Sequence, residues 1–238
     1  MNFYALGFLQ SDFYQKFRNA FIVSDRYKLY FEGLGVTLKI TVFAGLLGLL
    51  IGTAVAFMKL SKTRNGKPTV LSYIAQVYTD IIRGTPSVLQ LMIMYFVVMA
   101  SSKNPTLVAV LSFGINSGAY VSEIVRAGIL AVDKGQEEAG RSLGLSSRTT
   151  MLNIIIPQAI KNALPPLGNE FIVLMKETAI VGYVGMTDLT RIANKISTRT
   201  YEAFMPLIGA AVIYFIIIKL LTIGLGYLER RLRKSDSR

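Results

Sequence analysis

The stretch DKGQEEAGRSLGLSSRTTMLNIIIPQAIKNALPPLGNE, residues 133–170, is the longest polar interruption between the strongly apolar segments of this sequence. Its first part predicts a short helix over 136–143. Glu137 and Glu138 fall in the first turn of this helix, where the helix dipole favours negative charge. Gly144 suits the left-handed residue that ends such a helix. The stretch therefore begins as a compact, charged helix with a defined end.

The second part of the stretch predicts another helix. Ser146 can cap a run that continues to Ile156, and Pro157 disturbs this run because proline lacks an N–H. In the first helix, Ala139 and Leu143 share one face. A short helix with an apolar edge and charged flanks suits insertion into a groove on a soluble partner. An ordinary amphipathic connector would have the same pattern.

The composition is that of a membrane protein. Of the 238 residues, 52% are hydrophobic and 17% are charged, whereas soluble domains carry about 25% charged residues. Apolar runs long enough to cross a bilayer recur along the chain, which predicts an all-α transmembrane protein with several spans. The net charge of +12 comes from basic residues placed between these runs. That placement favours cytoplasmic loops beside anionic lipid over nucleic-acid binding.

Several kinds of site are excluded by what the sequence lacks. It contains no Cys and no His, which excludes thiol catalysis and zinc sites built on these residues. Neither a G-x-x-x-x-G-K-[ST] phosphate loop nor a G-x-S-x-G hydrolase motif occurs. The N-terminus lacks the pattern of a cleaved signal peptide. We therefore expect no catalytic residue, no metal and no cofactor on this chain.

The apolar runs predict five spans. The second run is too long for one straight crossing at about 1.5 Å per residue, and Gly84 and Pro86 within it predict a kink or break. Residues 186–203 are predicted to form a loop between the last two spans. The predicted spans are 31–58, 69–100, 106–132, 167–184 and 204–228.

Small and ionisable residues within the spans predict helix contacts. Gly45, Gly48 and Gly52 form a small face that allows another helix to approach closely. Acids and bases three residues apart can pair on one helix face. The predicted pairs are Asp80 with Arg83 and Glu123 with Arg126, and a structural role is the simpler reading of the second pair.

The N-terminal segment, residues 1–30, is amphipathic. Phe13, Phe17 and Phe21 lie one turn apart and form an apolar stripe. The stripe predicts a helix that lies in the membrane interface or packs on a neighbouring span, since both use the same face. The remaining predicted regions are a transmembrane domain, 31–230, and a basic tail, 231–238.

The basic residues also predict the orientation. With the N-terminus outside, the inner loops hold fourteen Lys and Arg residues and the outer segments hold eight. Because basic residues are concentrated on the cytoplasmic side, the N-terminus is predicted outside and the C-terminus inside. The stretch 133–166 is then cytoplasmic.

A spaced motif in this stretch carries a resemblance to a known family. Glu138-Ala139-Gly140, three residues, Gly144, nine residues, Ile154, one residue and Ile156-Pro157 resemble the EAA loop, E-A-A-x3-G-x9-I-x-L-P, of the membrane subunits of bacterial ABC importers. Gly140 and Ile156 depart from the family pattern but keep a small and an apolar residue. The loop covers about 133–162. The residues that the resemblance assigns to coupling with an ATPase are Gly135, Gln136, Glu137, Glu138, Ala139, Gly140, Leu143, Gly144 and Leu145.

The resemblance extends over about residues 30–230, to the polar amino-acid permeases of the histidine, glutamine and arginine type. It rests on Arg83-Gly84-Thr85-Pro86 with Gln90, Ala119-Tyr120 with Glu123, Gly135-Gln136, Leu164-Pro165 and Lys176-Glu177-Thr178. It implies a five-span, type I ABC importer permease in the bacterial cytoplasmic (inner) membrane. The implied partners are a second permease subunit, two ATPase subunits that bind ATP and Mg²⁺, and an extracytoplasmic amino-acid-binding protein.

Polar residues near two predicted breaks are the candidates for substrate contact. Pro165 and Pro166 are predicted to break the chain before the fourth span and to leave backbone groups free to line a cavity. Glu170, just beyond them, can receive an ammonium or a guanidinium group, or can pair within the bundle. The substrate-binding candidates are Glu170, Asn169, Thr85, Gly84, Gln90 and Tyr120.

The sequence leaves two other functions open. A membrane channel not driven by ATP would also carry polar residues in its spans. An intramembrane enzyme could use Glu123, Glu170 and Glu177, although no metal-ligand spacing supports it. The EAA spacing favours the importer subunit over both.

Overall fold

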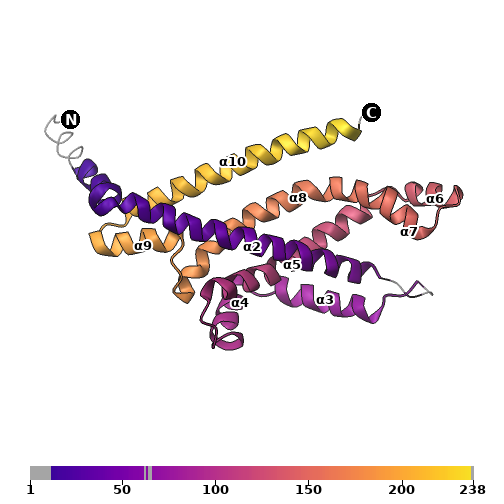
Figure 1. Cartoon of the computed structure of the whole chain (residues 1–238), viewed down its shortest axis with the longest axis horizontal. Helices are drawn as coiled ribbons and strands as arrows, with labels where there is room; N and C mark the ends of the chain where they lie inside the picture. Colours follow the sequence, from indigo (N-terminus) through magenta and orange to yellow (C-terminus); the bar gives the residue numbers. More distant parts are fainter. Residues whose placement is uncertain (1–11, 62, 64–65, 237–238) are drawn as a thin grey trace.

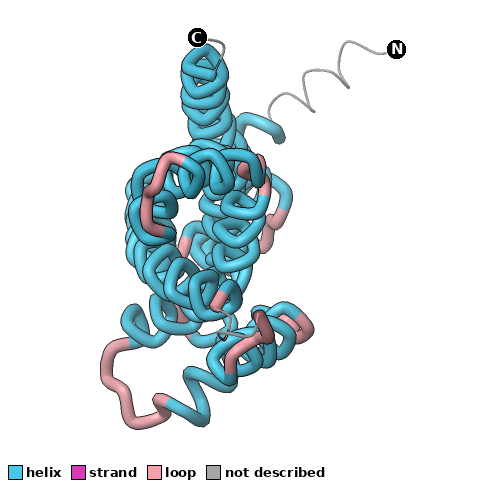
Figure 2. The backbone as a smooth tube through the Cα atoms, turned by 90° about the vertical axis from the view of Figure 1, so that its right-hand side faces the viewer, coloured by secondary structure: helices cyan, strands magenta, loops and turns pink. Residues whose placement is uncertain are grey.

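The computed structural model describes residues 12–61, 63 and 66–236. Within this part every element is a helix (Figure 2), which confirms the all-α prediction. The start of the predicted N-terminal segment, residues 1–11, and the end of the basic tail, residues 237–238, lie outside the described residues.

The α-helices are α2 (Arg26–Leu60), α3 (Val70–Arg83), α4 (Ser87–Ile93), α5 (Pro105–Leu130), α6 (Lys134–Ser142), α7 (Ser147–Thr150), α8 (Ile156–Glu177), α9 (Leu189–Thr200) and α10 (Phe204–Asp236). The 3-10 and π segments are η1 (Arg18–Ile22), η2 (Val23–Asp25), η3 (Met94–Val98), η4 (Met151–Ile155) and η5 (Thr178–Val184).

The long helices run along one axis and give the molecule two ends (Figure 1). The N-terminal segment and α9 lie at one end, and α6, α7 and the C-terminus lie at the other. By length and apolarity, Asp12–Leu60, Pro105–Leu130 and Phe204–Leu232 can each cross a membrane. The bent pair of α3 with 87–98 is either a fourth, broken span or a re-entrant loop. The fourth predicted span, 167–184, overlaps α8, and its crossing of the membrane stays a prediction.

The most extensive contact between two helices is that of α2 with α5. A Cβ atom at Gly52 would lie 2.5 Å from Val121 Cγ1, and one at Gly48 would lie 3.0 Å from Ser117 Cβ. The third glycine of the predicted small face, Gly45, lies against the Phe171 ring of α8. Small residues therefore allow the close approach that the sequence predicted.

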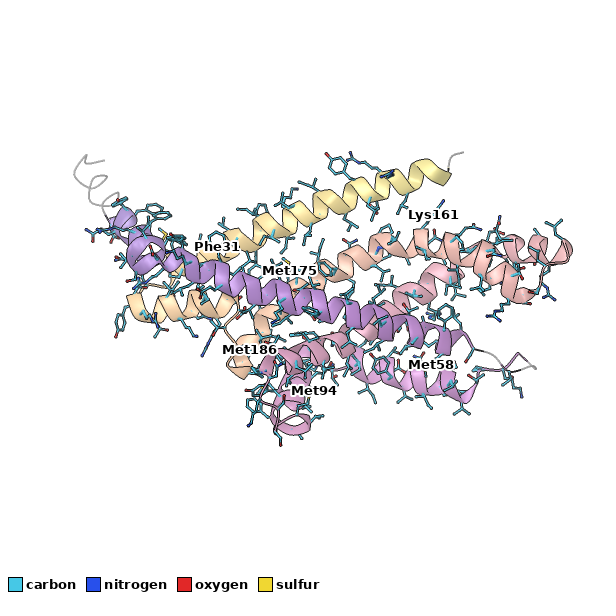
Figure 3. The ribbon with its side chains drawn as sticks, viewed as in Figure 1. Phe31, Met58, Met94, Lys161, Met175 and Met186 are labelled. Atoms are coloured by element: carbon cyan, nitrogen blue, oxygen red, sulfur yellow. The ribbon has the colours of Figure 1, made fainter. Side chains whose placement is uncertain are left out.

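The predicted break in the second apolar run is confirmed. Helix α3 ends at Arg83, α4 begins at Ser87, and the two axes are bent by 104°. Proline at 86 cannot donate a backbone hydrogen bond, which ends the first helix at this point. The break turns the chain from α3 into α4, and the labelled Met94, the residue after α4, lies at the lower edge of the molecule (Figure 3).

The predicted break before the fourth span is wrong. Pro165 and Pro166 do not break the chain, because both lie inside the continuous helix α8. The reason is tertiary packing. Gly128 of α5 lets this helix approach so closely that a Cβ there would lie 2.9 Å from the Ala159 carbonyl and 3.0 Å from Ala163 Cβ. Neighbouring helices of this kind allow prolines within membrane helices. The fourth span is predicted to end at Val184, whereas α8 ends at Glu177 and the 3-10 segment η5 continues the chain to Val184.

The predicted loop 186–203 is also wrong, because it contains helix α9. Asp188 caps this helix by accepting from the backbone N–H groups of Thr190 and Arg191, at 2.9 and 3.0 Å. The buried face of α9 repeats with helical spacing and packs against Tyr30 and Ala210. Its members are Leu189, Ile192, Ala193 and Ile196. The segment is an amphipathic helix, and its apolar face fixes it to α2 and α10.

The N-terminal aromatic stripe, Phe13, Phe17 and Phe21, is predicted either to lie in the membrane interface or to pack on a neighbouring span, and its residues differ in this respect. The ring centroid of Phe21 lies 5.3 Å from that of Tyr30, and Phe21 fills the space beside Gly209 of α10. Phe13 and Phe17 stay 58% and 42% exposed. Phe21 thus packs on neighbouring spans, and the outer part of the stripe remains available to the membrane interface.

Candidate functional site

Helix α6 and the residues that follow it form the surface predicted to couple with an ATPase. Asp133 begins the helix by accepting from the Gly135 N–H at 2.6 Å. The helix ends as predicted at Gly144, whose φ of +82° lies in the left-handed region. Ser146 then caps α7 by accepting from the Thr149 N–H at 3.1 Å. The order of helix, glycine stop and second helix is therefore confirmed.

Most of the predicted coupling residues lie on the surface. Leu143 is 81% exposed. Two residues differ from the rest: Gly140 is buried and Leu145 is half-buried. The exposed members are Gly135, Gln136, Glu137, Glu138, Ala139, Leu143 and Gly144.

The inner side of α6 rests on η4 and the start of α8. A Cβ at Gly140 would lie 2.8 Å from Thr150 Cγ2, so glycine here allows α6 to approach. The Gln136 side chain accepts from Gln158 of α8 at 3.3 Å. Pro157 does not stop the run. The chain passes through the π segment η4, in which the Ile156 N–H donates to the Met151 carbonyl, and continues as α8. Helix α6 is therefore attached to the helix that carries Glu170.

Gln90 holds the break at 84–86 together. Its Nε2 donates to the Ile82 carbonyl at 2.7 Å and to Thr85 Oγ1 at 2.7 Å. Its Oε1 accepts from Asn116 Nδ2 of α5 at 2.9 Å. Gln90 and Thr85 are thus hydrogen-bonded within the protein, and Asn116 joins the break to the core of the bundle.

Arg83 does not form the predicted ion pair with Asp80. Among the described residues, Asp80 accepts from Gln76 Nε2 at 2.7 Å, and the Arg83 guanidinium lies 5.3 Å from the centroid of the Tyr120 ring. A cation above an aromatic face is stabilised by the ring quadrupole. The i, i+3 spacing permitted the pair, but the aromatic ring of α5 supplies a competing partner.

Glu170 lies on α8 and is half-buried. Its Oε1 accepts from the Ser117 hydroxyl of α5 at 3.1 Å. The side chain lines a cavity of about 390 Å³ between α2, α5, α8 and α10. Asn169 is exposed and Glu177 is half-buried two turns further along the helix. Met175, on the same helix, is fully buried (Figure 3). Glu170 therefore faces a polar contact and a space within the bundle.

The structure brings the candidate substrate residues into two groups joined by α5. Thr85, Gln90 and Tyr120 belong to the group around the break, where Gly84 is exposed. Glu170 belongs to the cavity group. The adjacent residues Asn116 and Ser117 contact one group each. The predicted span 106–132 contains both residues, but their bridging role was not predictable. The sequence of a span does not show which other helices lie on either side of it.

Glu123 is the centre of an ion cluster. Its carboxylate accepts from Arg126 Nη2 at 2.9 Å, as predicted, and also from Lys59 Nζ. The Lys59 side chain is only 4% exposed. Lys59 lies 64 positions away in sequence, so its role was not predicted. The described part of the chain contains no cluster of three or more acids that could hold a metal ion.

Comparison with known proteins places this arrangement in a family. Residues 48–234 match the family described as binding-protein-dependent transport system inner membrane component. An arginine transport system permease protein of Bacillus subtilis (strain 168) is 42% identical over 208 residues, covering 86% of this chain and 93% of that protein. A glutamine transport system permease protein of Escherichia coli (strain K12) is 37% identical over 209 residues, covering 86% and 93%.

A solved structure agrees in fold. The crystal structure of an amino acid ABC transporter with histidines contains a chain that is 44% identical, with a TM-score of 0.80, covering 89% of this chain and 98% of that one. The matched region includes the helices that carry the exposed α6 surface, the break at 84–86 and Glu170. The chain therefore belongs to the family of binding-protein-dependent transport system inner membrane components.

Proposed function

We propose that this chain is the permease subunit of an ATP-driven importer that carries a polar amino acid with a basic or amide side chain into the cell. Relatives named for arginine and glutamine transport, at 42% and 37% identity over most of both chains, support this substrate class. The sequence has no phosphate loop, so ATP and Mg²⁺ belong to a partner ATPase.

The proposed assembly contains two permease subunits, two ATPase subunits and an extracytoplasmic amino-acid-binding protein. Five spans, with α8 as the fourth, put the N-terminus outside. The C-terminus and the α6 surface then lie in the cytoplasm. Two observations support this topology: the excess of basic residues on the predicted inner loops, and the location of α6 and the C-terminus at one end of the bundle (Figure 1).

The α6 surface is the proposed docking site for the ATPase. An exposed leucine beside exposed acidic residues on a short, rigid helix suits insertion into a groove with an apolar floor and basic rims. Glycine at 140 keeps this helix close to Thr150, and Gln136 contacts Gln158. A displacement of α6 would therefore act directly on η4 and α8.

Helix α8 transmits this displacement to the substrate path. It is continuous from Ile156 to Glu177, through both prolines, and carries Glu170 about 21 Å from its first residue at about 1.5 Å per residue. Movement of the inner end would shift Glu170 relative to Ser117 and change the cavity between them. The continuity of α8 between the α6 surface and Glu170 is the observation that carries the proposal.

Aspartate substitutions at two glycines, one on the proposed docking site and one outside it, test this site. Gly144 and Gly66 both have positive φ, +82° and +75°, and an added Cβ at either would meet nothing within 4 Å. Replacement by aspartate therefore imposes a similar backbone strain of about 1 kcal/mol at each site. Only Gly144 lies on the proposed docking surface.

We expect the Gly144→Asp variant to reach the membrane but to copurify with at least tenfold less ATPase than the wild type. The Gly66→Asp variant should retain the ATPase. Copurification and amino-acid-stimulated ATP hydrolysis in proteoliposomes measure both effects. A Gly144→Asp complex with full ATPase content and activity would refute the docking role of this surface.

A further inference from the structure

A second cavity, with a polar lining, lies at the end of the bundle opposite α6. It has a volume of about 430 Å³ and lies between η5 and α9. Its position follows from the two connected segments: η5 continues α8 past Glu177, and α9 begins after Asp188. With the proposed topology, this cavity opens on the extracytoplasmic half of the membrane. The residues that line it are Ala179, Gly182, Tyr183, Thr190, Arg191 and Asn194.

Arg191 gives this cavity its charge. Within the described ranges, its guanidinium has no ion pair or hydrogen-bond partner, although its backbone N–H donates to Asp188. The adjacent carboxylate cannot readily serve as its partner. Asp188 is fully buried, and its two oxygens already accept from the N–H groups of Thr190 and Arg191. The other basic residue near this turn, Lys195, donates to Thr187 at 2.8 Å.

The lining of the cavity suits a carboxylate. A guanidinium presents a planar fork of donors that binds both oxygens of a carboxylate group. Asn194 lies three residues after Arg191, on the same side of α9, and adds an amide donor. Tyr183 adds a hydroxyl group, whereas the Thr190 side chain is hydrogen-bonded to Asp188. The aliphatic part of Arg191 passes beside Gly182, where an added Cβ would lie 3.5 Å from Arg191 Cδ.

We propose that this cavity binds the α-carboxylate of the amino acid at the outer mouth of the permease, with Arg191 as the charged anchor. The inference rests on the proposed function and adds a second cation to the path. The candidates around Glu170 and Gln90 offer one acid and several neutral groups, and the cation beside them, Arg83, already lies over the Tyr120 ring. An amino acid needs partners of both signs to enter an apolar layer.

The outer cavity and Glu170 are two separate sites on the continuous segment formed by α8 and η5. Ala179 follows Glu170 by nine residues, which corresponds to about 13 Å along a helix. The amino acid would be held first by its carboxylate in the outer cavity. Its cationic or amide end would then reach Glu170 as α8 moves. This order places recognition of the group common to all amino acids before recognition of the side chain.

Arg199 provides a matched control. It lies on α9, eight residues after Arg191, is also exposed and does not line the cavity. The test uses the permease–ATPase complex in lipid nanodiscs without the binding protein. The probes are L-arginine and L-glutamine, each compared with its α-carboxamide, which lacks the carboxylate. Melting temperatures of the complexes check that every variant is folded.

We expect the wild-type complex to bind at least one of the two amino acids about 10- to 100-fold more tightly than its carboxamide, the range typical of charge-assisted hydrogen bonds. Arg191→Gln should reduce binding of the amino acid to the level of the carboxamide. Arg191→Lys should retain part of the preference, because it keeps the charge but not the fork. Arg199→Gln should bind as the wild type does.

Three results would overturn the proposal in different ways. Unchanged amino-acid binding by Arg191→Gln would refute the carboxylate pocket and leave the proposed function intact. If Arg191→Gln keeps amino-acid binding but weakens association of the binding protein, measured separately with that protein added to the nanodiscs, Arg191 belongs to a contact with a carboxylate of that partner. A wild-type complex that binds neither amino acid would contradict the proposed substrate class, and with it this inference.

Discussion

The Ser117 hydroxyl of α5 donates to Glu170 Oε1 of α8 at 3.1 Å, at the edge of a cavity of about 390 Å³. The residue before it, Asn116, donates to Gln90 of α4 at 2.9 Å. Helix α5 therefore connects α4, which follows the break at 84–86, to Glu170 of α8. A change in the position of α8 would alter both contacts through one rigid element.

Glu170→Gln tests whether this acid contacts the transported amino acid. Glutamine keeps an oxygen that can accept from Ser117, so the helix contact is preserved while the charge is lost. We expect the KM for L-arginine uptake by the assembled complex to rise about tenfold or more. Uptake of L-glutamine should change less, because a neutral amide does not need a charged partner.

Glu177→Gln is the control for Glu170, since it removes a half-buried acid from the same helix but does not line the cavity. It should leave the ratio of arginine to glutamine uptake unchanged. If Glu170→Gln also leaves substrate preference and affinity unchanged, Glu170 has only a structural role.

Gly52→Ala should strongly destabilise the bundle. The added Cβ would lie 2.6 Å from Val121 Cβ and 2.8 Å from the Gly118 carbonyl, which are rigid parts of α5. Overpacking of this kind costs about 1–3 kcal/mol. Gly35, on the same helix, has nothing within 4 Å of the added Cβ, so Gly35→Ala should be neutral or stabilising. Thermal unfolding in detergent compares the two, and equal melting temperatures would contradict the packing.

Local sequence signals predicted the parts of the fold that depend on few residues. Gly84 and Pro86 located the break, Gly144 located the end of α6, and Ser146 located the next cap. Each signal acts through its own backbone or through a neighbour within one turn. The basis of these predictions is therefore present in the sequence itself.

The failed predictions depend on residues far away in the chain. Pro165 and Pro166 predict a break, but both lie inside α8, which packs closely against Gly128 of α5. The Asp80–Arg83 pair was displaced by the Tyr120 ring. Helix α9 was missed because three basic residues concealed an apolar face of four residues, although the spacing of that face was visible.

The same distinction applies to the site. Glu170 was selected as an acid within a span, but its partner Ser117 and its cavity arise from the packing of four helices. Gln90 was selected from a motif, and the structure commits its amide to internal hydrogen bonds. The sequence can identify unusual residues, whereas their orientation requires the tertiary arrangement.

Glu123→Gln should destabilise the inner end of the bundle more than Arg126→Gln does. Glu123 accepts from both Lys59 and Arg126, and the Lys59 side chain is 4% exposed while that of Arg126 is 38% exposed. Loss of Glu123 leaves a buried cation without its counter-ion, which costs about 3 kcal/mol. Loss of Arg126 removes a more exposed pair, which contributes less than about 1 kcal/mol. Equal melting temperatures of the two variants would show that Lys59 finds another partner.

Gly140→Ala should displace α6, because the new Cβ would lie 2.8 Å from Thr150 Cγ2 and 2.9 Å from its Oγ1. Thr150 Oγ1 is buried and, among the described residues, has no hydrogen-bond partner, so Thr150→Ala alone should cost little. The double variant Gly140→Ala/Thr150→Ala should therefore recover the ATP-driven uptake that the single Gly140→Ala variant loses. Gly224→Ala, with nothing within 4 Å of its added Cβ, controls for the alanine itself. Failure of Thr150→Ala to restore uptake would show that position 140 acts through the docked ATPase and not through its contact with Thr150.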